Sequence, residues 1–86
     1  IRVVIPSQLE SYTDGARALE AEGATVAQVL DDLDRRFPGS RFRVVDEQDR
    51  VRKHMRICTN GDMTQDIRLP VSAGDEVLIF GALSGG

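Results

Sequence analysis

The chain has 86 residues, a net charge of −3 and a single cysteine. A chain of this length forms one domain that buries only about 60 to 65% of its unfolded surface, which leaves little room for an enclosed catalytic pocket. The acidic excess disfavours nucleic acid as a partner, because phosphate binding requires a clustered positive charge.

Two β-rich segments at the start of the chain predict a hairpin. Residues 2–5 form a β-branched run that ends at Pro6, and residues 16–20 follow a polar stretch. Asp14-Gly15 is typical of a turn between such strands. We therefore expect residues 2–5 and 16–20 to pair.

Residues 25–37 predict the main helix. Thr25 and Gln28 have the spacing of a capping box, in which each side chain satisfies a free backbone N–H. Pro38-Gly39 ends the segment, because proline disfavours helical geometry at the preceding residue. The apolar residues recur at helical spacing and form one stripe: Val26, Val29, Leu30, Leu33 and Phe37.

The segment 40–54 is polar and of mixed charge, which predicts an irregular or short-helical connection. Its apolar residues are the expected anchors to the core: Phe42, Val44, Val45 and Val51. Residues 55–59 then alternate in hydrophobicity and end at Asn60-Gly61, a strong hairpin-turn signal, so they predict a third strand.

The last predicted strand begins at Glu76, and its apolar run Val77 to Phe80 does not alternate with polar residues. Such a run is typical of a central strand that is covered on both faces. The right-handed crossover rule favours first and last strands that lie parallel in the middle of the sheet. The order strand, strand, helix, strand, strand thus predicts an α+β fold, a ubiquitin-like β-grasp with a mixed sheet packed on one main helix.

Candidate chemical groups within the domain give no active site. Cys58 and His54 are four residues apart on one strand, about 13 Å, which is too far for a nucleophile and its base. One cysteine and one histidine cannot supply a tetrahedral metal site. The acids within residues 31–34 are typical of a solvated helix face, and the basic residues of 50–56 are balanced by acids just before them.

The cysteine content and the hydropathy of the chain indicate where in the cell the protein is expected. A single cysteine cannot form an internal disulfide, and no apolar stretch is long enough to span a bilayer. We expect a cytoplasmic protein with neither a membrane nor a nucleic-acid partner.

The C-terminal segment has no helical period and contains three glycines: Gly81, Ala82, Leu83, Ser84, Gly85 and Gly86. Glycine allows a backbone to pass through a narrow channel without a Cβ clash and at any φ. We predict a β-grasp domain over residues 1–80 and a flexible tail over residues 81–86, which delivers a terminal carboxylate into another enzyme.

This tail occurs together with the helix capped by Thr25, the Asn60-Gly61 turn and a last strand that starts Asp75-Glu76-Val77. In this combination, which spans nearly the whole chain, the sequence resembles the MoaD/ThiS family of ubiquitin-like sulfur carriers. Within that family it is most similar to the longer, cysteine-biosynthesis type, through Ile5-Pro6, Tyr12-Thr13, Phe37-Pro38-Gly39 and residues 50–54.

The resemblance implies that the chain is not an enzyme and binds no cofactor itself. A ubiquitin-activating-like (E1-like) enzyme would use ATP to adenylate the Gly86 carboxylate, and sulfur would then displace AMP. The resulting thiocarboxylate would donate sulfur within a sulfur-accepting synthase. Phe80 would contribute to docking, and the tail would thread into the partner through Gly81, Ala82, Leu83, Ser84 and Gly85.

Three other functions are compatible with the same residues. The chain would be the small subunit of a molybdopterin synthase, a protein modifier conjugated through Gly86 to lysine amines, or an interaction domain whose diglycine is incidental. The acceptor of the sulfur, a precursor of cysteine, of a cofactor or of a natural product, is left open by the sequence.

Overall fold

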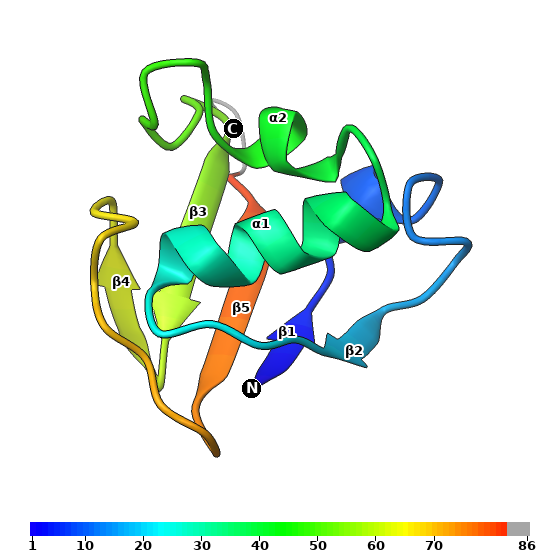
Figure 1. The fold of residues 1–86 in the computed structure, drawn as a ribbon. Helices are drawn as coiled ribbons and strands as arrows, with labels where there is room; N and C mark the ends of the chain where they lie inside the picture. Colours follow the sequence, from blue (N-terminus) through cyan, green and yellow to red (C-terminus); the bar gives the residue numbers. More distant parts are fainter. Residues whose placement is uncertain (83–86) are drawn as a thin grey trace.

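The computed structural model describes residues 1–82, which form one five-stranded sheet with helices packed against it (Figure 1). In chain order the elements are β1 (Arg2–Val4), the 3₁₀ helix η1 (Ser7–Leu9), β2 (Ala18–Glu20), α1 (Val26–Arg36), α2 (Ser40–Val44), β3 (Met55–Thr59), β4 (Asp62–Thr64) and β5 (Glu76–Gly81). The strand order is β2-β1-β5-β3-β4, with β1 parallel to β5 and the other neighbours antiparallel. The predicted mixed sheet with parallel first and last strands at its centre is confirmed.

β1 and β2 form the predicted first hairpin, in which Val3 pairs with Leu19. The connection between them is more ordered than a plain loop, since it contains η1 and a buried threonine. The Thr13 hydroxyl donates to the carbonyl oxygen of Ala16 at 2.9 Å. Asp14-Gly15 provides the turn, with φ values of 55° and 83°.

Helix α1 begins and ends as predicted. The Thr25 hydroxyl accepts a hydrogen bond from the Gln28 N–H at 3.2 Å. The Gln28 side chain in return accepts from the Ala24 N–H at 2.8 Å, one residue earlier than a standard capping box. Phe37 ends the helix and is half-buried. The other four stripe residues are buried against the sheet: Val26, Val29, Leu30 and Leu33.

The connection after α1 contains the short helix α2, in agreement with the prediction. Val44 and Val45 are buried in the core, but the prediction that Phe42 anchors this segment is wrong, because its side chain is 55% exposed. Two residues along a helix correspond to about 200°, so a helix that points Val44 inward turns Phe42 outward. The Arg52 guanidinium lies 4.3 Å from the Phe42 ring centroid and covers part of it.

β3 turns into β4 at Asn60-Gly61, where φ is 49° and 91°. β4 is a fifth strand that the sequence did not predict, because its three residues are too few to show alternation. The Asn-Gly dipeptide was its only signal, since a two-residue hairpin turn requires a second arm.

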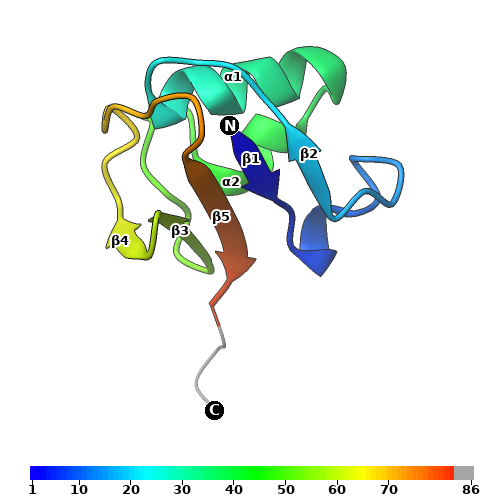
Figure 2. The same ribbon diagram turned by 90° about the horizontal axis from the view of Figure 1, so that it is seen from below.

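The prediction that β5 is covered on both faces is wrong. Val77 and Ile79 are fully buried, whereas Leu78 and Phe80 point to the opposite face and are only half-buried. Figure 1 and Figure 2 show the reason, since α1 and α2 both pack on the same face of the sheet. The core therefore lies on one side of the sheet, formed by Val3, Ile5, Leu9, Ala21, Val26, Val29, Leu30, Leu33, Val44, Val45, Met55, Ile57, Ile67, Val71, Val77 and Ile79.

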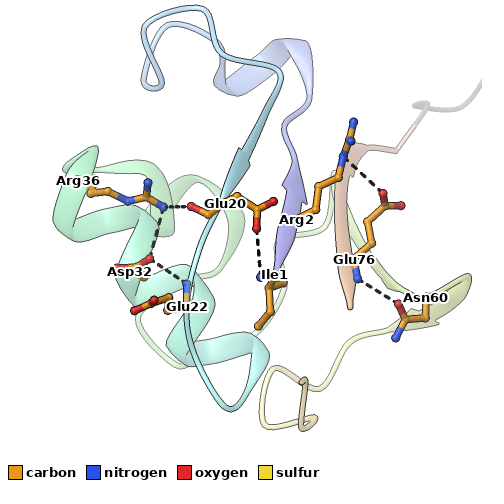
Figure 3. Close-up of polar contacts among 8 residues, drawn as sticks. All are labelled: Ile1, Arg2, Glu20, Glu22, Asp32, Arg36, Asn60 and Glu76. Carbon is orange, nitrogen blue, oxygen red and sulfur yellow. Dashed lines mark hydrogen bonds and ion pairs between the residues drawn. The ribbon is translucent and has the colours of Figure 1, made fainter. Parts of the chain in front are cut away.

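Polar contacts join the elements at the edges of this core (Figure 3). The Glu22 N–H donates to the Asp32 carboxylate at 3.0 Å and so ties the segment after β2 to α1. On the other side of the sheet, Arg2 pairs with Glu76 at 3.6 Å, and the Glu76 N–H donates to the Asn60 side chain at 3.0 Å.

Candidate functional site

Strand β5 carries the chain out of the centre of the sheet, at the end where β3 begins and where η1 follows β1 (Figure 2). Gly81 pairs with Met55, and the Ala82 N–H donates to the His54 carbonyl oxygen at 2.8 Å. The strand thus runs one residue past the boundary predicted at residue 80. We call Gly81 and Ala82, with the residues that hold them, the tail exit.

Three of the residues predicted to dock or thread lie within the described part of the chain. Phe80 is half-buried on the sheet face that the helices leave free, Gly81 ends β5, and Ala82 is half-buried next to His54. The other predicted site residues lie outside the described residues: Leu83, Ser84, Gly85 and Gly86.

The sheet face opposite the helices, which we call the open face, is apolar beside the tail exit. The strand registers place Val4, Leu78 and Phe80 on it, together with Cys58, and all four are half-buried. Met63, which pairs with Cys58 from β4 and is 58% exposed, extends this surface to the sheet edge. A contiguous exposed apolar surface is typical of an interaction site.

Of the open face, the sequence predicted only Phe80. Alternation along β5 separates Val77 and Ile79 from Leu78 and Phe80, and this is the signal that identifies the remaining members. This alternation identifies the exposed members only when the structure shows that the helices cover a single face of the sheet.

Positive side chains border the tail exit, although the whole chain is acidic. Arg56 pairs in register with Phe80 on the open face, and Lys53 precedes the His54 that holds Ala82. Within residues 1–82, the side chains of Lys53 and Arg56 form no ion pair. The Arg56 guanidinium donates instead to the carbonyl oxygens of Lys53 and Met55 at 2.9 and 2.8 Å. The exit therefore combines an apolar surface with an unpaired positive rim.

The candidate groups that the sequence offered within the domain do not come together in the part of the chain that the structure describes. Cys58 lies half-buried on the open face, and no hydrogen bond joins it to His54, which precedes β3. Residues 1–82 contain no cluster of three or more His, Cys, Asp or Glu that could hold a metal ion. Neither described α-helix is long and apolar enough to cross a membrane.

The acids within residues 31–34 are structural rather than merely solvated. Asp34 accepts a hydrogen bond from the Gly39 N–H at 3.0 Å and so fixes the turn after α1. The hydrogen bond from the Glu22 backbone is the main cause that lowers the pKa of Asp32. Partial burial opposes this shift, and the two arginines that follow on α1 add to it. The lowered pKa of Asp32 thus results mainly from the hydrogen bond that joins the segment after β2 to α1.

One residue of the tail exit was missed by the sequence analysis. The carboxamide of Gln8, on η1, lies directly over Gly81, where a Cβ would meet its Nε2 at 1.8 Å. The two residues lie near opposite ends of the sequence, so no local pattern connects them.

The chain is similar to known proteins over nearly its whole length. A family model described as the ThiS family matches residues 3–86. The sulfur carrier protein CysO of Mycobacterium tuberculosis is 26% identical over 91 residues, which cover 100% of this chain and 98% of that protein.

Solved structures share the whole fold. A chain in the crystal structure of the Amycolatopsis orientalis BexX/CysO complex superposes with a TM-score of 0.89 and 31% identity, covering 99% of this chain and 98% of that chain. SAMP1 from Haloferax volcanii superposes with a TM-score of 0.72 and 26% identity, covering 99% and 97%. These similarities confirm the predicted β-grasp fold.

Proposed function

Because the chain belongs to the ThiS family, we propose that it is a sulfur carrier protein, a co-substrate of other enzymes rather than an enzyme itself. The observation that carries this proposal is that the family match extends through residue 86 and so includes the Gly85-Gly86 pair. Similarity to CysO over the full length of this chain supports the same function.

The proposed chemistry takes place on the Gly86 carboxylate. In the partner enzyme a carboxylate oxygen attacks the α-phosphorus of ATP and pyrophosphate leaves, which gives an acyl adenylate. A sulfide-level sulfur donor then attacks the acyl carbon and AMP leaves. The product is a Gly86 thiocarboxylate, whose sulfur is the nucleophile passed to a sulfur-accepting synthase. ATP-dependent loading is compatible with the cytoplasmic location expected from the sequence.

The tail exit and the open face would present Gly86 to an E1-like adenylating enzyme. Four residues follow Ala82 in the sequence, and even fully extended they span at most about 14 Å. The reacting carboxylate therefore cannot be far from the end of β5, so the surface around the exit must contact the partner. This supports Phe80 as a docking residue.

The composition of that surface indicates what the partner presents. Leu78 and Phe80 with their neighbours would form the apolar centre of the interface, and Lys53 and Arg56 its charged rim. We expect an apolar patch with an acidic border at the entrance of the partner's active site. The Amycolatopsis orientalis CysO assembles with BexX, which supports protein partners for carriers of this kind.

Intact-mass measurement tests the proposal. The chain is incubated with a sulfide source and the adenylating enzyme of its host, with and without ATP. We expect an ATP-dependent mass increase equal to the difference between sulfur and oxygen, located at Gly86 by fragmentation.

A variant that ends at Gly85 should remain unloaded while melting at the same temperature, and Ser72→Ala, at an exposed serine before the start of β5, should load normally. No mass shift in the wild-type chain, with an enzyme shown to act on another carrier, would overturn the sulfur-carrier proposal.

A second candidate function is protein modification through Gly86. It is favoured by the similarity to SAMP1, a small archaeal modifier protein. A ladder of covalent adducts on other proteins in the host, lost when Gly86 is removed, would support it. Isolation in a lasting complex with a larger catalytic subunit would instead indicate the small subunit of a molybdopterin synthase.

A further inference from the structure

Gln8 occupies the place of a side chain that Gly81 lacks. A Cβ built on Gly81 would lie 1.8 Å from Nε2, 2.7 Å from Cδ and 3.1 Å from Oε1 of Gln8. Alternation along β5 puts position 81 on the helix-covered face with Val77 and Ile79, and its partner Met55 is 1% exposed. The Gln8 side chain is exposed, and its carboxamide lies over the last residue of the strand, at the edge of the core.

The rest of η1 fixes the backbone of Gln8 near Gly81. Leu9, the next residue, is 2% exposed within the core, and its N–H donates to the Pro6 carbonyl oxygen at 3.0 Å. Just past the end of β5, the Ala82 N–H donates to the His54 carbonyl oxygen at 2.8 Å. The chain at Gly81 and Ala82 thus has two neighbours: the exposed Gln8 carboxamide of η1 lies over Gly81, and Ala82 donates a backbone hydrogen bond to the segment before β3.

We propose that Gln8 is a positioning residue, which holds Gly81 against the sheet so that the partner enzyme meets a tail base that is already ordered. This inference rests on the proposed sulfur-carrier function. Ordering the backbone of one residue corresponds to about a fivefold to thirtyfold factor in an equilibrium constant. A carrier that has ordered Gly81 in advance binds its partner more tightly, whereas the chemical step at Gly86 is unaffected.

Two substitutions should disturb this contact from opposite sides. Gln8→Ala removes the carboxamide, and Gly81→Ala displaces it, since the end of a flexible side chain can swing away from the new methyl group. Because both changes remove the same contact between Gln8 and Gly81, the double variant should show no larger effect on KM than either single variant. Gln8→Met, which keeps the length of the side chain, should restore the packing.

The test is the steady-state kinetics of thiocarboxylate formation with the adenylating enzyme. We expect KM for the carrier to rise about fivefold or more in Gln8→Ala and Gly81→Ala, with kcat within about twofold of wild type, and KM to recover in Gln8→Met. Amide hydrogen exchange at Ala82, measured on the chain alone, should accelerate in Gln8→Ala. The control Ser72→Ala, at an exposed serine before the start of β5 and so at the opposite end of this strand from the exit, should match wild type in both measurements.

The outcomes separate the two proposals. A wild-type chain that is loaded, with Gln8→Ala unchanged in both KM and Ala82 exchange, would overturn the positioning role and leave the carrier function intact. Additive effects in the double variant, or a fall in kcat in place of a rise in KM, would also overturn it. A wild-type chain that is not loaded would overturn the carrier function, and the positioning role with it.

Discussion

Asp32 illustrates how much of the fold depends on single polar side chains. Its carboxylate accepts the Glu22 N–H at 3.0 Å and pairs with Arg36 at 3.4 Å (Figure 3). The backbone hydrogen bond from Glu22 is the largest cause that lowers the pKa of Asp32. Because the pKa is lower in the folded chain than in the unfolded chain, ionised Asp32 stabilises the fold above about pH 4. This contribution is lost as the pH falls through the folded pKa.

We therefore predict that Asp32→Asn lowers the free energy of unfolding by about 1 kcal/mol at about pH 7, because an amide accepts the Glu22 hydrogen bond without the charge. The difference from wild type should narrow at acidic pH, as the pH falls through the lowered folded pKa of Asp32 and its carboxylate becomes protonated. Urea unfolding followed by circular dichroism, from about pH 7 down into this range, measures the difference. Asp62→Asn, at an exposed position of β4, is the control, and an equal loss in both variants would contradict the prediction.

At the level of elements, the β3–β4 hairpin depends on its two turn residues. Asn60 and Gly61 both have positive φ, and a Cβ at Gly61 would meet nothing within 4 Å. A side chain there is therefore disfavoured by backbone conformation alone. The Asn60 side chain also accepts the Glu76 N–H, so the turn is tied to the central strand (Figure 3).

Gly61→Ala should lower the free energy of unfolding by about 1 kcal/mol, which is the penalty for an ordinary residue in left-handed geometry. Gly61→Asn is the matched comparison, and its loss should be smaller because asparagine tolerates this region. Chemical denaturation of the three proteins decides the point. An equal or larger loss in Gly61→Asn would contradict the prediction.

For the whole molecule, the one-sided arrangement of the layers separates folding from binding. The helices and the core occupy one face of the sheet, so the open face and the tail exit can change with little effect on stability. Phe80 lies at the meeting point of these two surfaces and is only half-buried. Its side chain can therefore contribute to an interface as well as to the fold.

We predict that Phe80→Ser raises KM for the adenylating enzyme about tenfold, because truncation of an aromatic anchor removes much of an interface's binding energy. The free energy of unfolding should also fall, by about 1 to 2 kcal/mol, because the half-buried ring removes part of its surface from water on folding. Enzyme kinetics and thermal unfolding measure the two effects. Leu69→Ser, at an exposed leucine outside the open face, is the control and should leave KM unchanged. An unchanged KM in Phe80→Ser would argue against docking through this face.

Much of the fold could be predicted from the sequence because its signals are local. The capping pair Thr25 and Gln28 with the apolar stripe defined α1, and Asn60-Gly61 defined the end of β3. The β-branched runs near both ends of the chain predicted the central pair of strands. The family resemblance rests on residues at the same positions, and the terminal diglycine directed attention to the tail.

Other features depend on which segments meet in space, and only the tertiary structure decided them. Leu78 faces outward because both helices pack on one side of the sheet, and Phe42 is exposed because α2 turns Val44 into the core. Gln8 reaches Gly81 only because β1 lies parallel to β5, which brings η1 to the end where the last strand finishes. A local pattern determines what an element is, whereas contacts between distant segments determine which of its faces remains open to a partner.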